Sequence, residues 1–355
     1  MATNNNDKTL NVPHLRFPEF SGEWEETELQ DIVPNICSGK DKISNNGKAV
    51  LYGSTGVIGR TNSASYKENI VLVARVGANA GQMQIGNAPC GVTDNTLVID
   101  AKEWNDYIYY FLQHYNLNRL VFGSGQPLIT GGMLKRIKVR YGCKAERNNI
   151  TRLLCLIDER IATQNKIIEK LESLIKGQRV CYMQRVYGNN VHLSEIAQIY
   201  QPQTISSTEL TEDGFLVYGA NGIIGKYKDY NHETEQICIT CRGNTCGIVN
   251  YTKPMSWITG NAMVINTDKY QDKVYKRYLY HFLSAYNFNS IISGSGQPQI
   301  VRTPLEKLKI TLPPISEQKQ KAMILDRIQD KIDINHKVLN LYIRQKQYLL
   351  CQMFI

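Results

Sequence analysis

The chain has 355 residues, of which 42% are apolar, and a net charge of +9 at neutral pH. This length can hold two domains with real cores, and the apolar fraction suits a soluble globular protein. No apolar run approaches the roughly 20 residues needed to cross a bilayer. Residues 1–13 form a polar start without the apolar core of a signal peptide. The composition therefore predicts a cytoplasmic protein with a short disordered N-terminus and no membrane association.

The basic excess invites a nucleic-acid interpretation, but its distribution weakens that inference. Most of it lies in two stretches predicted to be helical, residues 146–189 and 316–355. Cations in the last turns of a helix favour its macrodipole. Charge alone therefore leaves two readings open, a solvated helix face and a DNA-facing basic stripe.

Residues 14–145 predict a first α+β domain. It opens with an irregular stretch rich in proline and aromatic residues. Apolar and β-branched runs then predict strands at 49–52, 69–76, 96–99 and 137–139. Residues 104–115 carry aromatic and aliphatic side chains at helical spacing, which predicts one helix among the strands. Short strands with an inserted helix are typical of the α+β class.

Residues 146–187 predict a long helix that packs lengthwise against a second helix. Apolar residues recur there in alternating steps of four and three, which is an a/d heptad seam. The pattern returns 171 residues later, in residues 316–355. The predicted seam residues are Leu154, Ile157, Ile161, Gln164, Ile168, Leu171, Leu325, Ile328, Ile332, Asn335, Leu339 and Tyr342.

Residues 188–315 repeat the first domain. The glycine frame of residues 52–60 returns at 218–226, and the Gly-Ser-Gly-Gln-Pro turn of residues 123–127 returns at 294–298. The glycines themselves predict tight turns with positive φ. Between them the residues differ, Ser54-Thr55 in one copy and Ala220-Asn221 in the other. A shared scaffold carrying two specificities would show this pattern.

Several polar residues in these turns are candidates for reading nucleic-acid bases. Arg75 and Arg242 each precede a matched glycine, and arginine pairs with guanine as asparagine does with adenine. An ordinary surface ion pair is equally open for each arginine. Gln126 and Gln297 lie in identical turns, which favours phosphate contact or loop architecture. The full candidate set is Tyr52, Ser54, Thr55, Arg60, Arg75, Asn79, Asn95, Ser124, Gln126, Tyr218, Asn221, Lys226, Arg242, Asn244, Thr245, Asn261, Ser295 and Gln297.

No catalytic or metal-binding constellation stands out. Cys238, Cys241 and Cys246 resemble a metal site only superficially, because the first two would point to opposite faces of a strand. A structural zinc ion also normally requires four ligands. The six histidines show no pairing motif, and residues 312–315 lack the polar and aromatic ends of an adenine-methyltransferase loop. The sequence therefore predicts a non-catalytic chain with no metal site.

Three motifs together resemble the specificity (S) subunits of type I restriction-modification systems. They are Leu15-Arg16-Phe17-Pro18-Glu19-Phe20, the two Gly-Ser-Gly-Gln-Pro turns, and Leu312-Pro313-Pro314-Ile315-Ser316-Glu317-Gln318-Lys319. The resemblance covers essentially residues 13–355. It departs at residues 140–146, where the first copy lacks the Pro-Pro-Ile-Ser-Glu-Gln motif. The exact start of the first long helix therefore stays open.

The resemblance implies two target-recognition domains, each reading one half of a split double-stranded DNA sequence. They would be separated by two long helices that form an antiparallel coiled coil. It implies two modification subunits as partners, which bind S-adenosylmethionine and methylate adenine, and further restriction subunits. No cofactor is expected on this chain. A rival class stays open, a scaffold or adaptor whose two domains bind protein or glycan. Salt-dependent binding to duplex DNA separates the two classes.

The antiparallel arrangement is also expected from the order of the segments. Each long helix begins where its own domain ends, so a parallel pair would bring both domains to one end. Two half-sites on one face of DNA need centres about 34 Å apart or more, and only the antiparallel pair leaves that room. Gln164 and Asn335 interrupt the two seams near the middle of each helix. We expect their amides to face each other and fix the register, rather than to lie independently in water.

Overall fold

The computed structural model describes residues 11–355 except Pro34, Ser124, Arg185 and Ser295, so two of the candidate site residues, Ser124 and Ser295, lie outside the described residues. The chain divides into two compact units, unit 1 with Met1–Asn165 and Val338–Ile355, and unit 2 with Lys166–Lys337. Among the described residues, no helix is both long and apolar enough to cross a membrane.

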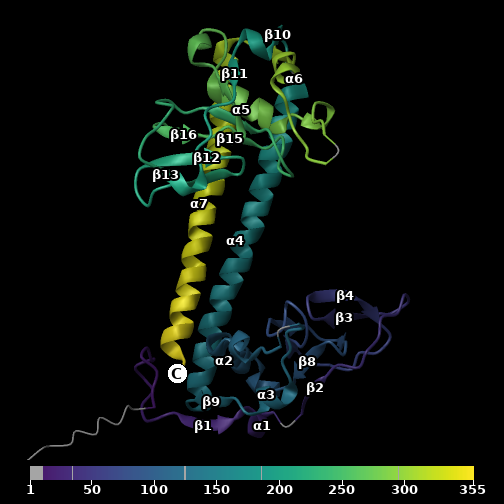
Figure 1. Cartoon of the computed structure of the whole chain (residues 1–355). Helices are drawn as coiled ribbons and strands as arrows, with labels where there is room; N and C mark the ends of the chain where they lie inside the picture. Colours follow the sequence, from purple (N-terminus) through teal and green to yellow (C-terminus); the bar gives the residue numbers. More distant parts are fainter. Residues whose placement is uncertain (1–10, 34, 124, 185, 295) are drawn as a thin grey trace, which may run out of the picture. The chain divides into compact units, whose positions relative to one another are not determined.

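Two long helices are shared between the units. They are α4 (Lys144–Gln184) and α7 (Ile315–Met353), drawn in Figure 1. Unit 1 contains the start of α4 and the end of α7, and unit 2 contains the remainder of both. Both helices begin and end within three residues of the predicted limits, including the start that the sequence left open. The sequence-based division treated the helices as separate segments, whereas each compact unit includes part of both.

Unit 1 is an α+β domain built from three small sheets. β1 pairs with β9, the order β2-β8-β5-β6 forms a four-stranded sheet, and β4-β3-β7 forms a three-stranded sheet. The strands are β1 (Glu25–Glu28), β2 (Ile36–Ser38), β3 (Ala49–Gly53), β4 (Gly56–Thr61), β5 (Ile70–Ala74), β6 (Met83–Gly86), β7 (Cys90–Val92), β8 (Thr96–Ile99) and β9 (Lys138–Tyr141). Its own helices are α1 (Leu29–Ile32), α2 (Asn105–Tyr115) and α3 (Gly131–Lys135).

The strand β5 lies between two hydrophobic cores because its side chains alternate in direction. Val71 and Val73 belong to the larger core, which also contains α2 and parts of both long helices. Ile70 and Leu72 belong to a smaller core shared with Tyr52 of the three-stranded sheet. All five residues of β5 are buried, which explains why this strand reads as an unbroken apolar run.

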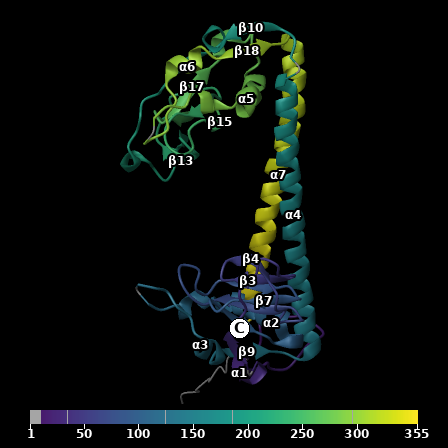
Figure 2. The same cartoon turned by 90° about the vertical axis from the view of Figure 1, so that its right-hand side faces the viewer.

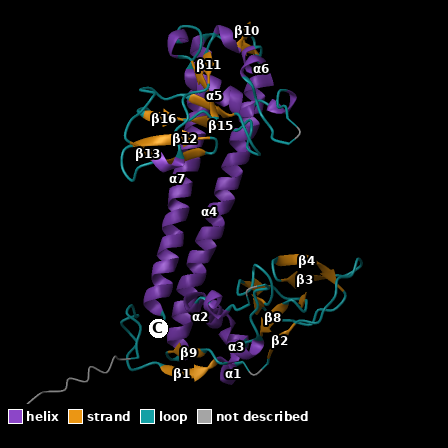
Figure 3. Ribbon diagram, viewed as in Figure 1, coloured by secondary structure: helices purple, strands orange, loops and turns teal. Residues whose placement is uncertain are grey.

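Unit 2 repeats this topology strand for strand, which confirms the duplication. Figure 3 colours the helices and strands of both units. β10 pairs with β18, and the other two sheets have the orders β11-β17-β14-β15 and β13-β12-β16. The strands are β10 (Asn189–His192), β11 (Gln198–Tyr200), β12 (Phe215–Gly219), β13 (Gly222–Tyr227), β14 (Ile237–Thr240), β15 (Val249–Tyr251), β16 (Ser256–Ile258), β17 (Ala262–Asn266) and β18 (Lys309–Leu312). Its own helices are α5 (Lys276–Ala285) and α6 (Arg302–Glu306).

In unit 1, the start of α4 runs antiparallel to the end of α7. Asp158 pairs with Lys346 at 2.7 Å, and the guanidinium of Arg160 lies 5.9 Å from the ring of Tyr342. Residue numbers therefore rise on α4 as they fall on α7. Phe354, which follows the end of α7, is buried against α2 in the core of the domain.

The remainder of the two helices is also antiparallel within unit 2. Glu172 lies 3.7 Å from His336, and the ring of Tyr182 lies 5.6 Å from the ammonium of Lys321. The expected antiparallel pairing is thus confirmed in each unit. All twelve predicted seam residues are buried or half-buried. Because Gln164 belongs to unit 1 and Asn335 to unit 2, their mutual contact stays a prediction.

A buried side chain in the first turn of each long helix joins the helix to its domain. In unit 2, β10 and β18 adjoin the start of α7 (Figure 2). There the side-chain oxygen of Gln318 accepts a hydrogen bond from the Tyr275 backbone N–H at 2.8 Å. Its side-chain nitrogen donates to the Lys273 carbonyl at 3.1 Å and to the Pro313 carbonyl at 2.9 Å. In unit 1 the equivalent residue, Arg147, stacks 3.3 Å above the ring of Trp104. We call this buried contact between a domain and the start of its helix the lock. Unit 1 lacks the Pro-Pro-Ile-Ser-Glu-Gln motif and forms its lock by stacking of Arg147 on Trp104 instead.

A polar network lies in the joint of unit 2, which is the place where α5 packs against α4 and α7. Arg179 on α4 donates to Nδ1 of His281 at 3.2 Å, and Nε2 of His281 donates to Asp326 on α7 at 2.8 Å. Arg277 also donates to Asp326, through Nε at 2.8 Å. Since Nδ1 is an acceptor here, His281 is neutral, and burial lowers its pKa.

We expect this histidine to make the folded state sensitive to mild acid. Its folded pKa lies below the ordinary value of about 6.5, so its contribution to stability is complete above that pH and is lost as the pH falls toward the folded pKa. Glutamine at this position keeps one donor and one acceptor. Urea unfolding of His281→Gln at pH 7 and pH 5 should show a smaller loss of stability on acidification than the wild type. An equal loss in both proteins would contradict the assignment.

Candidate nucleic-acid interface

In unit 1, three loops meet at the end of β5 and bring four candidate residues together. The backbone N–H of Arg75 donates to the carbonyl of Asn95 at 2.9 Å, and that of Gly77 donates to the carbonyl of Pro127 at 2.9 Å. Gly77 and Gly81 both have positive φ, so the turn between them is one that glycine favours. Arg75, Asn79, Asn95 and Gln126 therefore lie on one loop cluster.

Unit 2 builds the same cluster with the same backbone contacts. The N–H of Cys241 donates to the carbonyl of Asn261 at 3.2 Å, and that of Gly243 donates to the carbonyl of Pro298 at 2.9 Å. The candidate residues on the three loops are Arg242, Asn244, Thr245, Asn261 and Gln297, and all but the half-buried Thr245 are exposed. Four of the five predicted side chains are therefore open to a ligand.

The two arginines are displaced by one position relative to each other. Arg75 stands where unit 2 has the buried Cys241, and its guanidinium donates to Ser38 Oγ at 3.2 Å. Arg242 is exposed and forms an isolated bridge with Gln299 through its backbone. The same cluster therefore presents its cation from different backbone positions in the two units.

The tip of the β12–β13 hairpin adjoins the cluster in unit 2. Thr240, the last residue of β14, donates from its hydroxyl to the carbonyl of Ala220 at the tip. This bond places the neighbouring Asn221 near the loop that carries Arg242, and Asn221 is exposed. In unit 1 a different residue holds the tip, because the amide of Gln84 on β6 donates to the carbonyl of Gly53 at 2.7 Å. Ser54 and Thr55 follow, and Thr55 is exposed.

Arg60 and Lys226 lie on the hairpins but away from the tips. Each pairs with the strand that begins the hairpin, Arg60 with Val50 and Lys226 with Leu216. The guanidinium of Arg60 donates to the Lys48 carbonyl at 2.9 Å. Lys226 is 3.3 Å from Asp213. The structure therefore does not bring these two cations into the loop clusters.

The side chains of Tyr52 and Tyr218 are buried inside the domains. The hydroxyl of Tyr52 accepts from the backbone N–H of Asn87 at 3.2 Å, and that of Tyr218 accepts from the backbone N–H of Lys253 at 3.1 Å. Burial raises the pKa of Tyr218. Both rings hold the three-stranded sheet on its core, which favours a framework role over contact with a ligand.

Sequence reasoning missed a pair of exposed β-branched residues on each hairpin. Val57 and Ile58 on β4 are 62% and 45% exposed, and Ile223 and Ile224 on β13 are 55% and 49% exposed. They occupy the same positions in the two repeats. The repeated apolar pair just after the second glycine of the frame was the available signal, because a strand with one face in solvent normally alternates with polar residues.

Comparison with known proteins identifies the family to which both domains belong. Residues 21–173 and 189–341 each match the model described as "Type I restriction modification DNA specificity domain". The chain belongs to this family. Each specificity domain thus includes one α+β domain and part of the long helix that follows it.

Two relatives and one solved structure place these specificity domains among known proteins. The chain is 31% identical over 147 residues to the Type I restriction enzyme EcoprrI specificity subunit of Escherichia coli, which covers 40% of this chain and 36% of that protein. It is 25% identical over 391 residues to the MjaVIII specificity subunit of Methanocaldococcus jannaschii, covering 91% and 89%. It therefore spans about a third of the bacterial relative and most of the archaeal one.

The fold is similar to the crystal structure of the type I restriction-modification S subunit from M. genitalium. The TM-score is 0.72 at 18% identity, over 97% of this chain and 99% of that one. At this identity the likeness concerns the fold alone. It agrees with the two specificity domains and two long helices expected from the sequence.

The framework role of the two buried tyrosines can be tested by removing their hydroxyls. Tyr52→Phe and Tyr218→Phe should each lower the free energy of unfolding by about 1 kcal/mol, because a buried backbone N–H loses its acceptor. Urea denaturation measures the loss. DNA affinity of the folded variants should stay unchanged. A variant that keeps full stability and loses DNA affinity would instead place that hydroxyl at the ligand.

Proposed function

We propose that this chain is the DNA-specificity subunit of a type I restriction-modification complex, and that each specificity domain reads one half of a split target. The observation that carries this is the loop cluster with its adjoining hairpin tip, which is built twice on one framework with different side chains. Ser54 and Thr55 at one hairpin tip become Ala220 and Asn221 at the other. Recognition of two half-sites of different sequence requires different side chains, and these can be carried on the same backbone framework.

The side chains of the clusters divide into two proposed roles. Arg75, Arg242 and Asn244 supply the fork and amide geometries that recognise guanine and adenine edges in the major groove. Gln126 and Gln297 stand in loops of identical sequence, and side chains common to both domains do not distinguish two half-sites. We assign the glutamine loops to the sugar-phosphate backbone, where contacts position a protein without specifying sequence.

The outer faces of the long helices are proposed to recruit the partner subunits. Large apolar side chains on α4 and α7 remain more than a third exposed, namely Leu156, Ile167, Leu174, Val180, Met323, Ile324, Ile334, Leu341, Ile343 and Tyr348. Apolar patches of this kind on a soluble helix commonly mark protein–protein contacts. We propose two modification subunits there, carrying S-adenosylmethionine, together with restriction subunits. No cofactor is proposed for this chain.

An adaptor that binds protein or glycan accounts for the helices but gives no reason for the arginine and asparagine residues in a repeated loop cluster. The test is salt dependence. A chain that contacts DNA phosphates loses affinity for duplex DNA steeply as salt rises, because binding releases condensed counterions. Co-expression with the cognate methyltransferase, followed by genome-wide mapping of methylated adenines, then reveals the split target.

We expect the purified chain alone to transfer no methyl groups and to cut no DNA. The reason is that no residue set in the sequence supplies a nucleophile, a general base or a metal-activated water. Incubation with tritiated S-adenosylmethionine and target DNA, and separately with magnesium and plasmid DNA, measures both activities. Activity of the chain without partners, above that of a mock purification, would refute this expectation.

The two domains are expected to act as independent modules. Exchanging residues 14–145 for the corresponding domain of another specificity subunit should change one half of the methylated motif and leave the other half intact. Sequencing of methylated adenines in cells that carry the hybrid provides the measurement. If both halves changed, the reading of one half-site by each domain would be wrong.

A further inference from the structure

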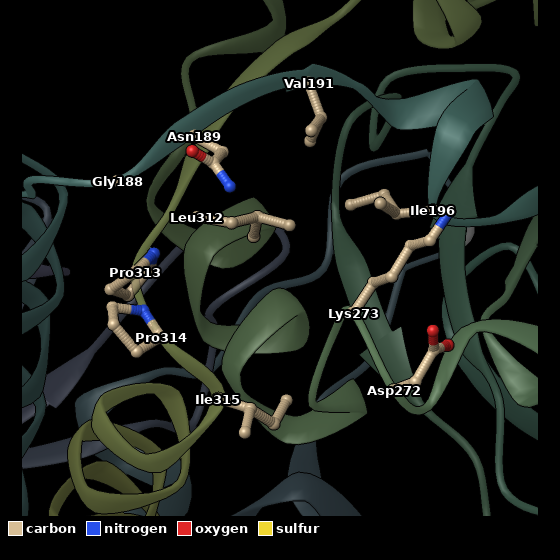
Figure 4. Close-up of a pocket in the computed structure, with 10 residues that line it drawn as sticks. All are labelled: Gly188, Asn189, Val191, Ile196, Asp272, Lys273, Leu312, Pro313, Pro314 and Ile315. Atoms are coloured by element: carbon tan, nitrogen blue, oxygen red, sulfur yellow. The ribbon is translucent and has the colours of Figure 1, made fainter.

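Unit 2 contains an open cavity of about 570 Å³ where β10 and β18 meet the start of α7 (Figure 4). Figure 4 shows Leu312, Pro313 and Pro314 on one side, and Ile196 with the stem of Lys273 on the other. Its remaining lining residues are Gly188, Asn189, Val191, Asp272 and Ile315. None of these residues belongs to the loop cluster of unit 2, so DNA recognition leaves the cavity unexplained.

In unit 1 the equivalent cavity is smaller, about 370 Å³, and is lined in part by Ile32, the counterpart of Ile196, and by the ring of Trp104. Glu25 pairs with Tyr141 as Asn189 pairs with Leu312, so Trp24 corresponds to Gly188 and Tyr141 to Leu312. Trp24 is buried in the core. The ring of Tyr141 lies 4.9 Å from that of Trp104, which is itself covered by Arg147. Unit 2 has small or aliphatic residues at the positions of Trp24 and Tyr141, and its cavity is the larger of the two.

A segment of the chain also covers an acidic residue beside this place in unit 1. Residues 11–24, here called the lead segment, present Arg16 to Glu146 through two hydrogen bonds of 2.7 and 2.8 Å. The side chain of Glu146 is 1% exposed as a result. Arg16 also donates to the Gly22 carbonyl at 2.6 Å, which folds the segment back on itself before Trp24.

The equivalent acid in unit 2 is still accessible. Glu317 follows Leu312 by five residues, as Glu146 follows Tyr141, and its side chain is 41% exposed. It pairs with Lys321 at 2.6 Å, one turn along α7. A carboxylate has about four acceptor sites, so this pair leaves room for the fork of an arginine. The open cavity and the accessible acid therefore both lie at the start of α7, where Ile315 lines the cavity and Glu317 carries the carboxylate.

We propose that this face of unit 2 docks a partner polypeptide that inserts an aromatic side chain into the cavity and places an arginine on Glu317. The occupant is argued from unit 1, where the lead segment and its neighbours supply these two chemistries from the chain itself. Aromatic side chains give large apolar contact and arginine gives bidentate pairing, and both are enriched at protein interfaces.

The test uses a synthetic fluorescein-labelled peptide with the sequence of residues 11–24 and the intact chain, followed by fluorescence anisotropy. Saturable binding is expected, and Glu317→Gln should weaken it at least five-fold. Leu312→Tyr, which copies the residue of unit 1, should abolish binding. Both variants should melt within a few degrees of the wild type, measured by circular dichroism. A peptide with Arg16→Gln should bind at least five-fold more weakly.

Glu146→Gln is the matched control, because it makes the same change at the equivalent position of unit 1. It should lower the melting temperature and leave peptide affinity unchanged, since the lead segment there is tethered at an effective concentration on the order of millimolar. Three results would overturn the proposal. They are no binding at 1 mM peptide, binding that Glu317→Gln and Leu312→Tyr both leave intact, or self-association of the chain that Arg16→Gln removes, which would make a second copy the occupant.

Discussion

The structure depends most on the buried side chain that locks each domain to the helix following it. Gln318 can both donate and accept, so one amide ties the start of α7 to the end of β18 and to the loop before α5. Breaking this lock would leave buried backbone groups without partners, which costs more than the hydrogen bonds contribute. A domain held in this way keeps a fixed orientation on its own helix, and its loop cluster inherits that precision.

The same framework carries two surfaces because the framework and the surface use different parts of the sequence. Glycines with positive φ, such as Gly77 and Gly243, set the turns. The side chains of β5 and β14 alternate between two cores in each unit, which sets the sheets. Neither set constrains the exposed side chains between them. Even the bond that holds the hairpin tip differs, coming from Gln84 in one unit and Thr240 in the other.

The sequence predicted what depends on local pattern or on the repeat. The long helices, β5, α2 and the duplication follow from apolar spacing and matched glycines. Burial of individual polar groups did not follow, because Tyr52 and Tyr218 sit inside the repeated frame and only the fold shows that their hydroxyls point inward. The lock at Gln318 was also missed, since its partner Tyr275 lies 43 residues away and no pattern links them.

The joints of the two units also differ in charge, which bears on how each domain finds its own helices. Asp106 lies three residues before Tyr109, and Arg277 lies three residues before the matching Tyr280, so Asp106 is the counterpart of Arg277. In unit 2, burial opposes ionisation of Asp326, but hydrogen bonds from the domain, including that of Arg277, lower its pKa. The first domain placed on the same helices would bring the carboxylate of Asp106 toward that of Asp326. Two acids in a half-buried joint repel, so this pairing is disfavoured. We therefore expect charge to disfavour this wrong pairing of domain and helices, in addition to any misfit of shape.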